Sequence, residues 1–275
     1  SGYVEFDVSA DTVLASDVRV EVNTTSGNSG YGGLRLRANW RGAGGLIKEG
    51  DGMATLTGDS KSYTGPTVIN QGVLQLTEPA TPFQSPSVSV TSGGQLRLTS
   101  ASTDGAPRTF TFGGTLSLDS LGREGTLPLS GQGISGALRY QPDTDNSIAI
   151  VPNTIAFAGL SGIHVEGSRN TMELSGTLSG PKGFIKTGGG NLILSAQNKR
   201  FLAPVIVSNG TLTVKGRILS AVEVAAGANL SGCGRVGPLS GLGTVALDGT
   251  VFTAPSAKGL NYGFAFATTG SPAYA

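Results

Sequence analysis

The chain has 275 residues, 44 of them Gly and 13 Pro, and its 19 Lys and Arg residues almost balance its 18 Asp and Glu residues. The glycines follow no three-residue period, which excludes a collagen-like helix, and a mean hydropathy of +0.06 at a net charge of +1 argues against a disordered chain. Charged residues are only 13% of the sequence, compared with about 25% in ordinary soluble proteins, so the charge indicates neither a nucleic-acid partner nor an anionic membrane.

The first forty residues contain two series of alternating apolar residues. One series begins at Val4 and the other at Val18, with an apolar residue at every second position. Because successive side chains of a strand point to opposite faces, both series predict strands.

A longer stretch then occurs twice without a gap, as residues 42–76 and again as residues 180–214. A repeated unit of this kind cannot bury its apolar face alone, so its recurrence predicts a core that is built by stacking one coil on the next. Identical residues fill many equivalent positions, among them Ile47 and Ile185, Lys48 and Lys186, Gly50 and Gly188, Gly52 and Gly190, Leu56 and Leu194, Lys61 and Lys199, Pro66 and Pro204, Gly72 and Gly210, and Leu74 and Leu212.

A shorter phrase recurs inside and between the two copies: a glycine followed by alternating aliphatic and polar residues. It occupies residues 72–76, 94–98, 114–118, 190–194 and 210–214. Neighbouring phrases are about 20 residues apart, which is typical of the coils of a β-solenoid. The alternation predicts half-buried strands, and no stretch of ten or more residues combines helical spacing with helix caps.

The sequence as a whole therefore predicts an all-β chain that forms a single β-solenoid over residues 1–275, with coils of roughly 20 residues. Residues 120–145 are less repetitive, and we expect an irregular coil or a loop there. If the alternation is interpreted correctly, Leu96→Ala should be strongly destabilising and Gln95→Ala, on the opposite face, should have little effect. The residues expected in one continuous core are Leu74, Leu76, Leu96, Leu98, Leu212 and Val214.

The repeat also resembles a known family. Residues 45–52 form a glycine-rich phrase with a lysine, residues 62–69 contain a Tyr-Thr-Gly turn, and residues 72–76 form a Gly-x-Leu-x-Leu strand. This order is similar to that of the autotransporter-associated, or passenger-associated, β-strand repeat. The second copy resembles the family as well, although residues 200–203 lack the Tyr-Thr-Gly turn, and residues 228–237 are similar to the Leu-Ser-Gly-x-Gly-x-Val-Gly phrase that commonly follows such repeats.

The resemblance implies a right-handed parallel β-helix that is exported to the bacterial surface or beyond. It brings no functional residues with it, because the family is defined by a structural unit. We find no apolar stretch typical of a transmembrane segment.

Few carboxylates are close enough in the sequence to act together in metal binding or catalysis. Asp143 and Asp145 fall in an Asp-Thr-Asp-Asn stretch, which fits either a calcium-binding loop or, as we expect, a solvated turn. Glu49 and Asp51 are also closely spaced, but the second copy has Thr and Gly at the equivalent positions, which favours a turn over a site.

The single histidine and the single cysteine are the remaining candidates. His164 and Glu166 could form an acid and base pair, but we expect them to lie on the exposed polar face of one strand. Cys233 stands where a small side chain is needed, and we expect a buried, inert thiol. The sequence contains no nucleophile elbow, phosphate loop or paired Cys and His spacing, so it predicts no catalytic residue, no cofactor and no metal.

Aromatic residues are scattered along the chain, and they fit either packing or a stacking platform for sugars. The residues in question are Tyr3, Tyr31, Trp40, Tyr63, Tyr140, Tyr262 and Tyr274.

These observations predict a non-enzymatic, extracellular structural β-solenoid, secreted by or displayed on a bacterium: a stalk, a fibre or surface-layer component, or an adhesin or passenger segment. We expect partners to be copies of the chain or further repeats, in end-to-end or lateral contact, because little charge keeps open strand edges apart. The alternative is a glycan-binding or polysaccharide-cleaving β-helix, with cell-surface glycans as partners. A groove of carboxylates and aromatics would favour the alternative, and a surface of Ser, Thr and Asn would favour the structural function.

Overall fold

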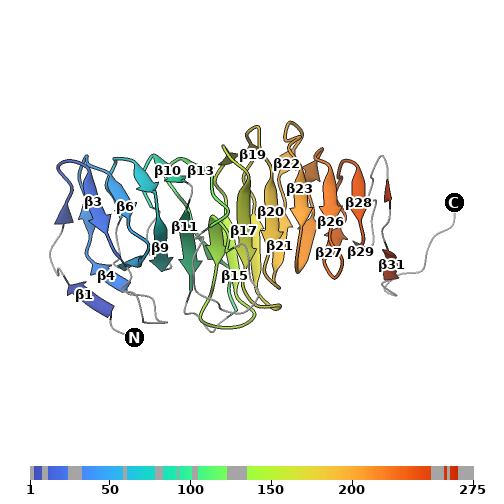
Figure 1. Ribbon diagram of the computed structural model, residues 1–275, viewed down its shortest axis with the longest axis horizontal. Helices are drawn as coiled ribbons and strands as arrows, with labels where there is room; N and C mark the ends of the chain where they lie inside the picture. Colours follow the sequence, from blue (N-terminus) through green and yellow to red (C-terminus); the bar gives the residue numbers. More distant parts are fainter. Residues whose placement is uncertain are drawn as a thin grey trace.

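The computed structural model describes residues 3–7, 12–23, 33–57, 61–77, 83–91, 93–100, 105–122, 135–248, 257–258 and 261–265. Over these residues the chain is an elongated stack of short strands, with its first coils at one end and its last coils at the other (Figure 1). Strands of successive coils pair in parallel, and a coil takes roughly 21 residues. The all-β parallel β-helix predicted from the sequence is confirmed. No described segment forms a helix that is long and apolar enough to cross a membrane.

Three sheets run along the stack of described residues, and two short two-stranded sheets lie beside them. Sheet I has 12 strands in the order β1 (Tyr3–Asp7), β4 (Gly33–Arg37), β7 (Met53–Thr57), β9 (Gly72–Thr77), β11 (Gly94–Thr99), β14 (Leu138–Tyr140), β17 (Ser161–Val165), β20 (Phe184–Thr187), β23 (Val205–Val207), β26 (Val222–Val224), β28 (Leu239–Gly241) and β30 (Ala257–Lys258). Sheet II has 7 strands in the order β19 (Leu178–Ser179), β16 (Ile155–Phe157), β13 (Thr115–Leu118), β10 (Ser87–Val90), β8 (Thr67–Ile69), β6 (Leu46–Glu49) and β3 (Val18–Glu21). Sheet III has 8 strands in the order β12 (Arg108–Thr109), β15 (Ile148–Val151), β18 (Thr171–Leu174), β21 (Asn191–Leu194), β24 (Thr211–Val214), β27 (Asn229–Gly232), β29 (Thr244–Asp248) and β31 (Asn261–Ala265). The two-stranded sheets pair β2 (Thr12–Val13) with β5 (Trp40–Arg41) and β22 (Gln197–Asn198) with β25 (Arg217–Ile218).

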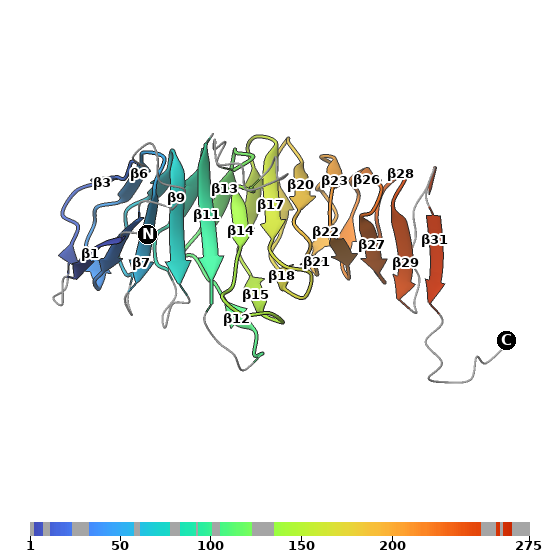
Figure 2. The ribbon, with the colours of Figure 1, turned by 60° about the horizontal axis from the view of Figure 1, so that its bottom comes forward.

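The core is made of columns of aliphatic side chains that run from coil to coil. In sheet I, whose strands β9, β11, β14 and β17 lie side by side in Figure 2, Leu74 pairs with Leu96, Leu96 with Leu138, and Leu138 with Ile163. Each of these side chains is at most 1% exposed, and a fully buried Leu or Ile stabilises a fold by roughly 1.5 to 3 kcal/mol. The continuous core predicted from the sequence is confirmed for all six of its residues: Leu74, Leu76, Leu96, Leu98, Leu212 and Val214.

The two copies of the repeat occupy different faces of the solenoid. In the first copy β6 belongs to sheet II and the next strand, β7, to sheet I. In the second copy the equivalent strand β20 belongs to sheet I and the next strand, β21, to sheet III. The change follows β12, where sheet III begins between a strand of sheet I and a strand of sheet II. Equivalent residues of the two copies therefore share a local structure but have different surroundings.

The outward face of sheet I differs from our expectation at Gln95. Its side chain points away from the core, yet it is only 1% exposed, because Ser135 and Gly136 lie over it. Its Nε2 donates hydrogen bonds to their carbonyl oxygens at 2.8 and 2.9 Å. Arg97, the next outward residue, is also buried and lies 3.6 Å from the sulfur of Met53. The expectation that Gln95→Ala has little effect assumed an exposed outward face, and we revise it because this part of sheet I is buried on both faces.

The less regular parts of the chain fall partly outside the described residues. The two alternating series near the N-terminus form β1 and β3, as predicted. Residues 123–134 lie outside the described residues, so the irregular coil or loop expected at 120–145 stays a prediction.

We expect Leu96→Ala to destabilise the fold by about 2 to 5 kcal/mol, because it opens a cavity in a fully buried column. Gln95→Ala should cost about 1 to 3 kcal/mol, because two buried carbonyls lose their donor. Gln75→Ala, at a half-buried outward position of the neighbouring strand, is the control and should stay within about 0.5 kcal/mol of the wild type. Urea unfolding measures all three, and a harmless Gln95→Ala would contradict the covered outer face.

Candidate functional site

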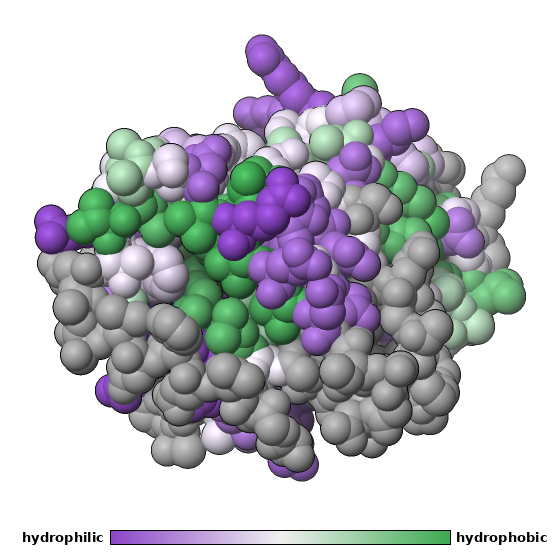
Figure 3. All heavy atoms as spheres, turned by 60° about the vertical axis from the view of Figure 1, so that its left-hand side comes forward, coloured by the Kyte–Doolittle hydropathy of each residue, from purple (hydrophilic) through white to green (hydrophobic). Residues whose placement is uncertain are grey.

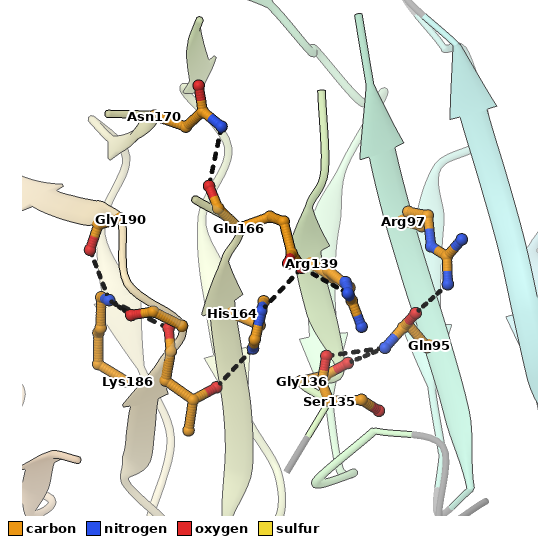
Figure 4. Close-up of polar contacts among 12 residues, drawn as sticks. Gln95, Arg97, Ser135, Gly136, Arg139, His164, Glu166, Asn170, Lys186 and Gly190 are labelled. Carbon is orange, nitrogen blue, oxygen red and sulfur yellow. Dashed lines mark hydrogen bonds and ion pairs between the residues drawn. The ribbon is translucent and has the colours of Figure 1, made fainter. Parts of the chain in front are cut away.

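A group of polar side chains with little exposure gathers on the outward face of sheet I. Gln95 and Arg97 lie on β11, Arg139 on β14 and His164 on β17, so these residues come from three adjacent strands (Figure 4). Glu166 follows β17 and lies between Arg139 and His164. This cluster holds His164 and Glu166, which the sequence offered as a candidate acid and base pair.

His164 is only 1% exposed. The expectation that it lies on an exposed polar face is therefore wrong, because the outward face of sheet I is covered here as it is at Gln95. Its Nε2 lies 3.1 Å from the Glu166 carboxylate and its Nδ1 lies 3.0 Å from the Thr187 hydroxyl. Since a carboxylate only accepts hydrogen bonds, Nε2 carries the hydrogen in the neutral ring and Nδ1 accepts from Thr187.

The charges of the cluster are set by burial and by their neighbours. Burial lowers the pKa of His164 from its usual 6.5, and the Arg139 guanidinium acts in the same direction while Glu166 opposes it. The hydrogen bond from His164 and the charge of Arg139, whose Nη2 lies 2.5 Å from the carboxylate, lower the pKa of Glu166 to about 2. The cluster at neutral pH is thus a neutral imidazole beside an ion pair, with both ring nitrogens of His164 engaged.

The other carboxylate candidates do not converge. Asp143 and Asp145 are exposed, as expected of a solvated turn, and no group of three metal-ligating side chains occurs among the described residues. Glu49 accepts a hydrogen bond from Asn70 at 2.9 Å and lies 3.8 Å from Arg19, beside the glycine turn at Gly50. These contacts fit a turn rather than a functional site, as the Thr and Gly at the equivalent positions of the second copy indicated.

Cys233 is exposed, so the expectation of a buried thiol is wrong. The flanking glycines Gly232 and Gly234 face inward instead, and a side chain at either would collide with the backbone of the preceding coil. Alternation then turns Cys233 outward.

The aromatic side chains that the structure describes pack inside the solenoid. Tyr63 and Tyr140 are fully buried and Trp40 is 7% exposed. The side chains of Tyr3, Tyr31, Tyr262 and Tyr274 lie outside the described residues, so the sugar-stacking alternative stays open for these four.

No role was predicted from the sequence for the lysine of the repeat, yet in the second copy four carbonyl oxygens surround its Nζ. Lys186 occupies an inward position of β20, paired with Ile163 of β17 and Val207 of β23, and it is fully buried. Its Nζ donates to carbonyl oxygens of the glycine turn (Figure 4) and to one of the next coil. The acceptors are Thr187 at 3.0 Å, Gly188 at 2.6 Å, Gly190 at 2.6 Å and Asn209 at 2.9 Å.

The first copy has the same arrangement. Lys48 is fully buried between Val20 and Ile69, one coil before and one coil after it. Its Nζ donates to the carbonyl oxygens of Glu49, Gly50 and Gln71 at 2.5, 2.7 and 3.2 Å, which correspond to three of the four acceptors in the second copy. We call the two arrangements the lysine cages.

A glycine of the following coil closes each cage. Gly210 has a φ of 68°, and a Cβ at this position would lie 2.4 Å from the carbonyl oxygen of Gly188 and 2.7 Å from the Lys186 Nζ. Gly72 has a φ of 67°, and a Cβ there would lie 2.4 Å from the carbonyl oxygen of Gly50. Only glycine combines this left-handed conformation with so close an approach.

Opposing effects act on the charge of the caged amine. Burial lowers the pKa of Lys186 to about 7 from its usual 10.5. The four carbonyl oxygens attract the protonated form and oppose this shift. The sequence did contain an indication of the cages, because alternation from Phe184 places Lys186 on the inward face, where a lysine needs partners.

Comparison with known proteins agrees with this geometry. The sequence profile of the passenger-associated-transport-repeat matches residues 46–76 and 184–214, which hold the two lysine cages. A similar protein is the adhesin BmaC autotransporter of Brucella suis biovar 1 (strain 1330), 28% identical over 247 residues. The alignment covers 90% of this chain but only 6% of the length of the adhesin. No solved structure matches the chain.

The chain is a parallel β-solenoid that carries passenger-associated transport repeats, as the resemblance of its sequence indicated. Its likeness to an autotransporter adhesin extends along nearly all of its length.

We expect acid to weaken the fold through Glu166. Because the pKa of this carboxyl is about 2 in the folded chain and 4.5 ordinarily, its ionised form stabilises the fold above pH 4.5, and this contribution is lost as the pH falls from 4.5 toward 2. Glu166→Gln should therefore lose less stability than the wild type over this interval, as measured by urea unfolding at several pH values. The exposed Glu223→Gln should follow the wild type, and identical curves for all three proteins would contradict the role of Glu166.

Proposed function

We propose that the chain is a non-enzymatic, rod-shaped segment of a bacterial surface or secreted protein, of the passenger or adhesin type. The observation that carries this proposal is the ladder of hydroxyl and amide groups on the outward face of sheet III. Thr213 donates to Asn191 of the preceding coil at 2.8 Å and lies 2.8 Å from the hydroxyl of Ser231 in the following coil. Such a ladder links successive coils through uncharged hydroxyl and amide groups.

Sheet II has a similar outward surface. Ser87 and Ser89 of β10 and Ser117 of β13 are half-buried, and Thr115 is exposed. A surface of this composition is the one that the sequence analysis associated with a structural function.

A glycan-cleaving function has less support in the described residues. The hollow at one corner is lined by Leu76, Phe83, Phe110 and Phe112 together with Lys61 and two threonines, and it contains no carboxylate. The carboxylate nearest to a histidine, Glu166, is paired with Arg139, and His164 has no ring nitrogen left to accept a proton from a substrate.

We expect the purified chain to release no reducing sugars or unsaturated products from a panel of acidic and neutral polysaccharides. His164→Gln and Glu166→Gln serve as matched variants, since both keep a polar side chain at the cluster. Product release by the wild type that either variant abolishes would overturn the proposal and make sheet I an active site.

The end of the solenoid formed by the first coils suits contact with a further coil. β3 is the outermost strand of sheet II, and its inward residues Val18 and Val20, with Val22 beyond it, are only half-buried against the core. Figure 3 views this end and shows apolar residues in its middle with hydrophilic residues beside them. The outer edge of β3 pairs with no described strand, and such an edge beside apolar side chains favours the addition of another parallel coil, from a second copy or from further repeats.

We expect the chain to self-associate in a concentration-dependent manner in sedimentation velocity experiments. Val20→Glu should weaken the association, because it places a charge at the apolar end. Thr115→Glu adds the same charge on the lateral face of sheet II and should leave it unchanged. A monomer at every concentration, or equal effects of the two variants, would contradict an end-to-end contact.

A further inference from the structure

Each lysine cage combines residues that the two copies share with carbonyls from positions where they differ, Glu49 and Gln71 in the first copy and Thr187 and Asn209 in the second. The shared residues are the lysine, two glycines of the turn and the closing glycine of the next coil. In the order of the chain these are Lys48, Gly50, Gly52 and Gly72 in the first copy and Lys186, Gly188, Gly190 and Gly210 in the second.

The cage arises from this local phrase rather than from its surroundings. Lys48 lies in sheet II and Lys186 in sheet I, yet their Nζ atoms have equivalent carbonyl partners. Another lysine that the two copies share has different burial in each of them: Lys61 is 1% exposed, whereas its equivalent Lys199 is exposed. A shared residue therefore does not by itself imply shared surroundings.

The carbonyl oxygens of the cage are arranged like the oxygen ligands of a cation site. Four backbone carbonyl oxygens converge on one point at 2.6 to 3.0 Å in the second copy, and rings of carbonyls replace the hydration shell of monovalent cations in proteins. A primary ammonium also has three N–H donors, which suit acceptors arranged around a single point.

We propose that the glycine turn of each repeat is a monovalent-cation site, that the repeat lysine occupies it as a built-in ammonium, and that the site binds a free primary ammonium when the lysine is removed. The role of the lysine is then to supply a positive charge and N–H donors to carbonyls that the turn directs into the core. This proposal concerns the repeat itself and holds whether or not the chain serves as an adhesin or passenger segment.

Chemical rescue tests the proposal. Lys186→Ala removes Cγ, Cδ, Cε and Nζ, and n-propylammonium replaces these four atoms. We expect Lys186→Ala to lower the Tm, and n-propylammonium to restore more than half of the loss in a saturable manner. Tetramethylammonium, which carries the same charge without an N–H donor, should restore none of it.

Lys186→Met is the matched control, because its side chain fills most of the same space without a charge. It should also lower the Tm, but n-propylammonium should not raise it, and the wild type should not respond either. Equal responses of Lys186→Ala, Lys186→Met and the wild type, or no response of Lys186→Ala, would overturn the proposal.

The wild-type protein provides a second test, which applies even if Lys186→Ala does not fold. Nitrogen-15 NMR of the lysine side chains should show slowly exchanging ammonium groups for Lys48 and Lys186 at a pH below 7, where the lowered pKa of Lys186 leaves its amine protonated; the signals are assigned through the side-chain carbons. Lys199, which is exposed, should exchange rapidly. Neutral amines at both caged positions, or ammonium exchange as fast as that of Lys199, would overturn the proposal.

Discussion

The structure depends on one constraint: each coil must turn where the coil below it turns, so that strands stack in parallel and the same columns of side chains meet. Backbone carbonyls at such a corner point partly into the core, where they need donors. In the repeats the chain meets this need with a lysine on the inward face of the strand before the corner. Leu46 and Phe184, two residues earlier on the same faces, are ordinary core residues. Each of these strands therefore packs against the core and also supplies the hydrogen-bond donor for the carbonyls of the corner that follows it.

This local solution explains how the repeat can move from one face of the solenoid to another. The strand, the glycine turn and the lysine form a unit that carries its own polar partners, and it requires from the rest of the molecule only a parallel neighbour on each side. Once sheet III has begun at β12, the second copy can therefore lie in sheets I and III instead of sheets II and I, and the residues shared by the two copies stay the same. Elsewhere side-chain amides do similar work: Asn170 donates to the carbonyl oxygen of Glu166 and accepts from the backbone of Ser147.

The architecture was predictable because it follows from local patterns. Alternation and the recurring glycine placed Leu74, Leu96 and Leu212 in the core, and the spacing of the phrase gave the length of a coil. The burial of Gln95 and His164 was not predictable, since it depends on Ser135 and Gly136, which lie about 40 residues along the chain from Gln95 and cross the outer face of sheet I. Cys233 was misplaced for a different reason: the glycines on either side of it take the inward positions, and their close approach to the previous coil is not visible in the sequence.

The coils do not all have the same number of residues. In sheet I the step from a residue to its partner in the next coil is 20 residues from Leu36 to Leu56, 25 from Leu138 to Ile163 and 17 from Val207 to Val224. Sheet II accompanies sheet I over the first coils and ends at β19, while sheet III accompanies it over the last coils to β31, so the cross-section changes along the stack. The rod therefore has a direction: its two ends are built from different pairs of sheets, and geometry alone distinguishes head from tail.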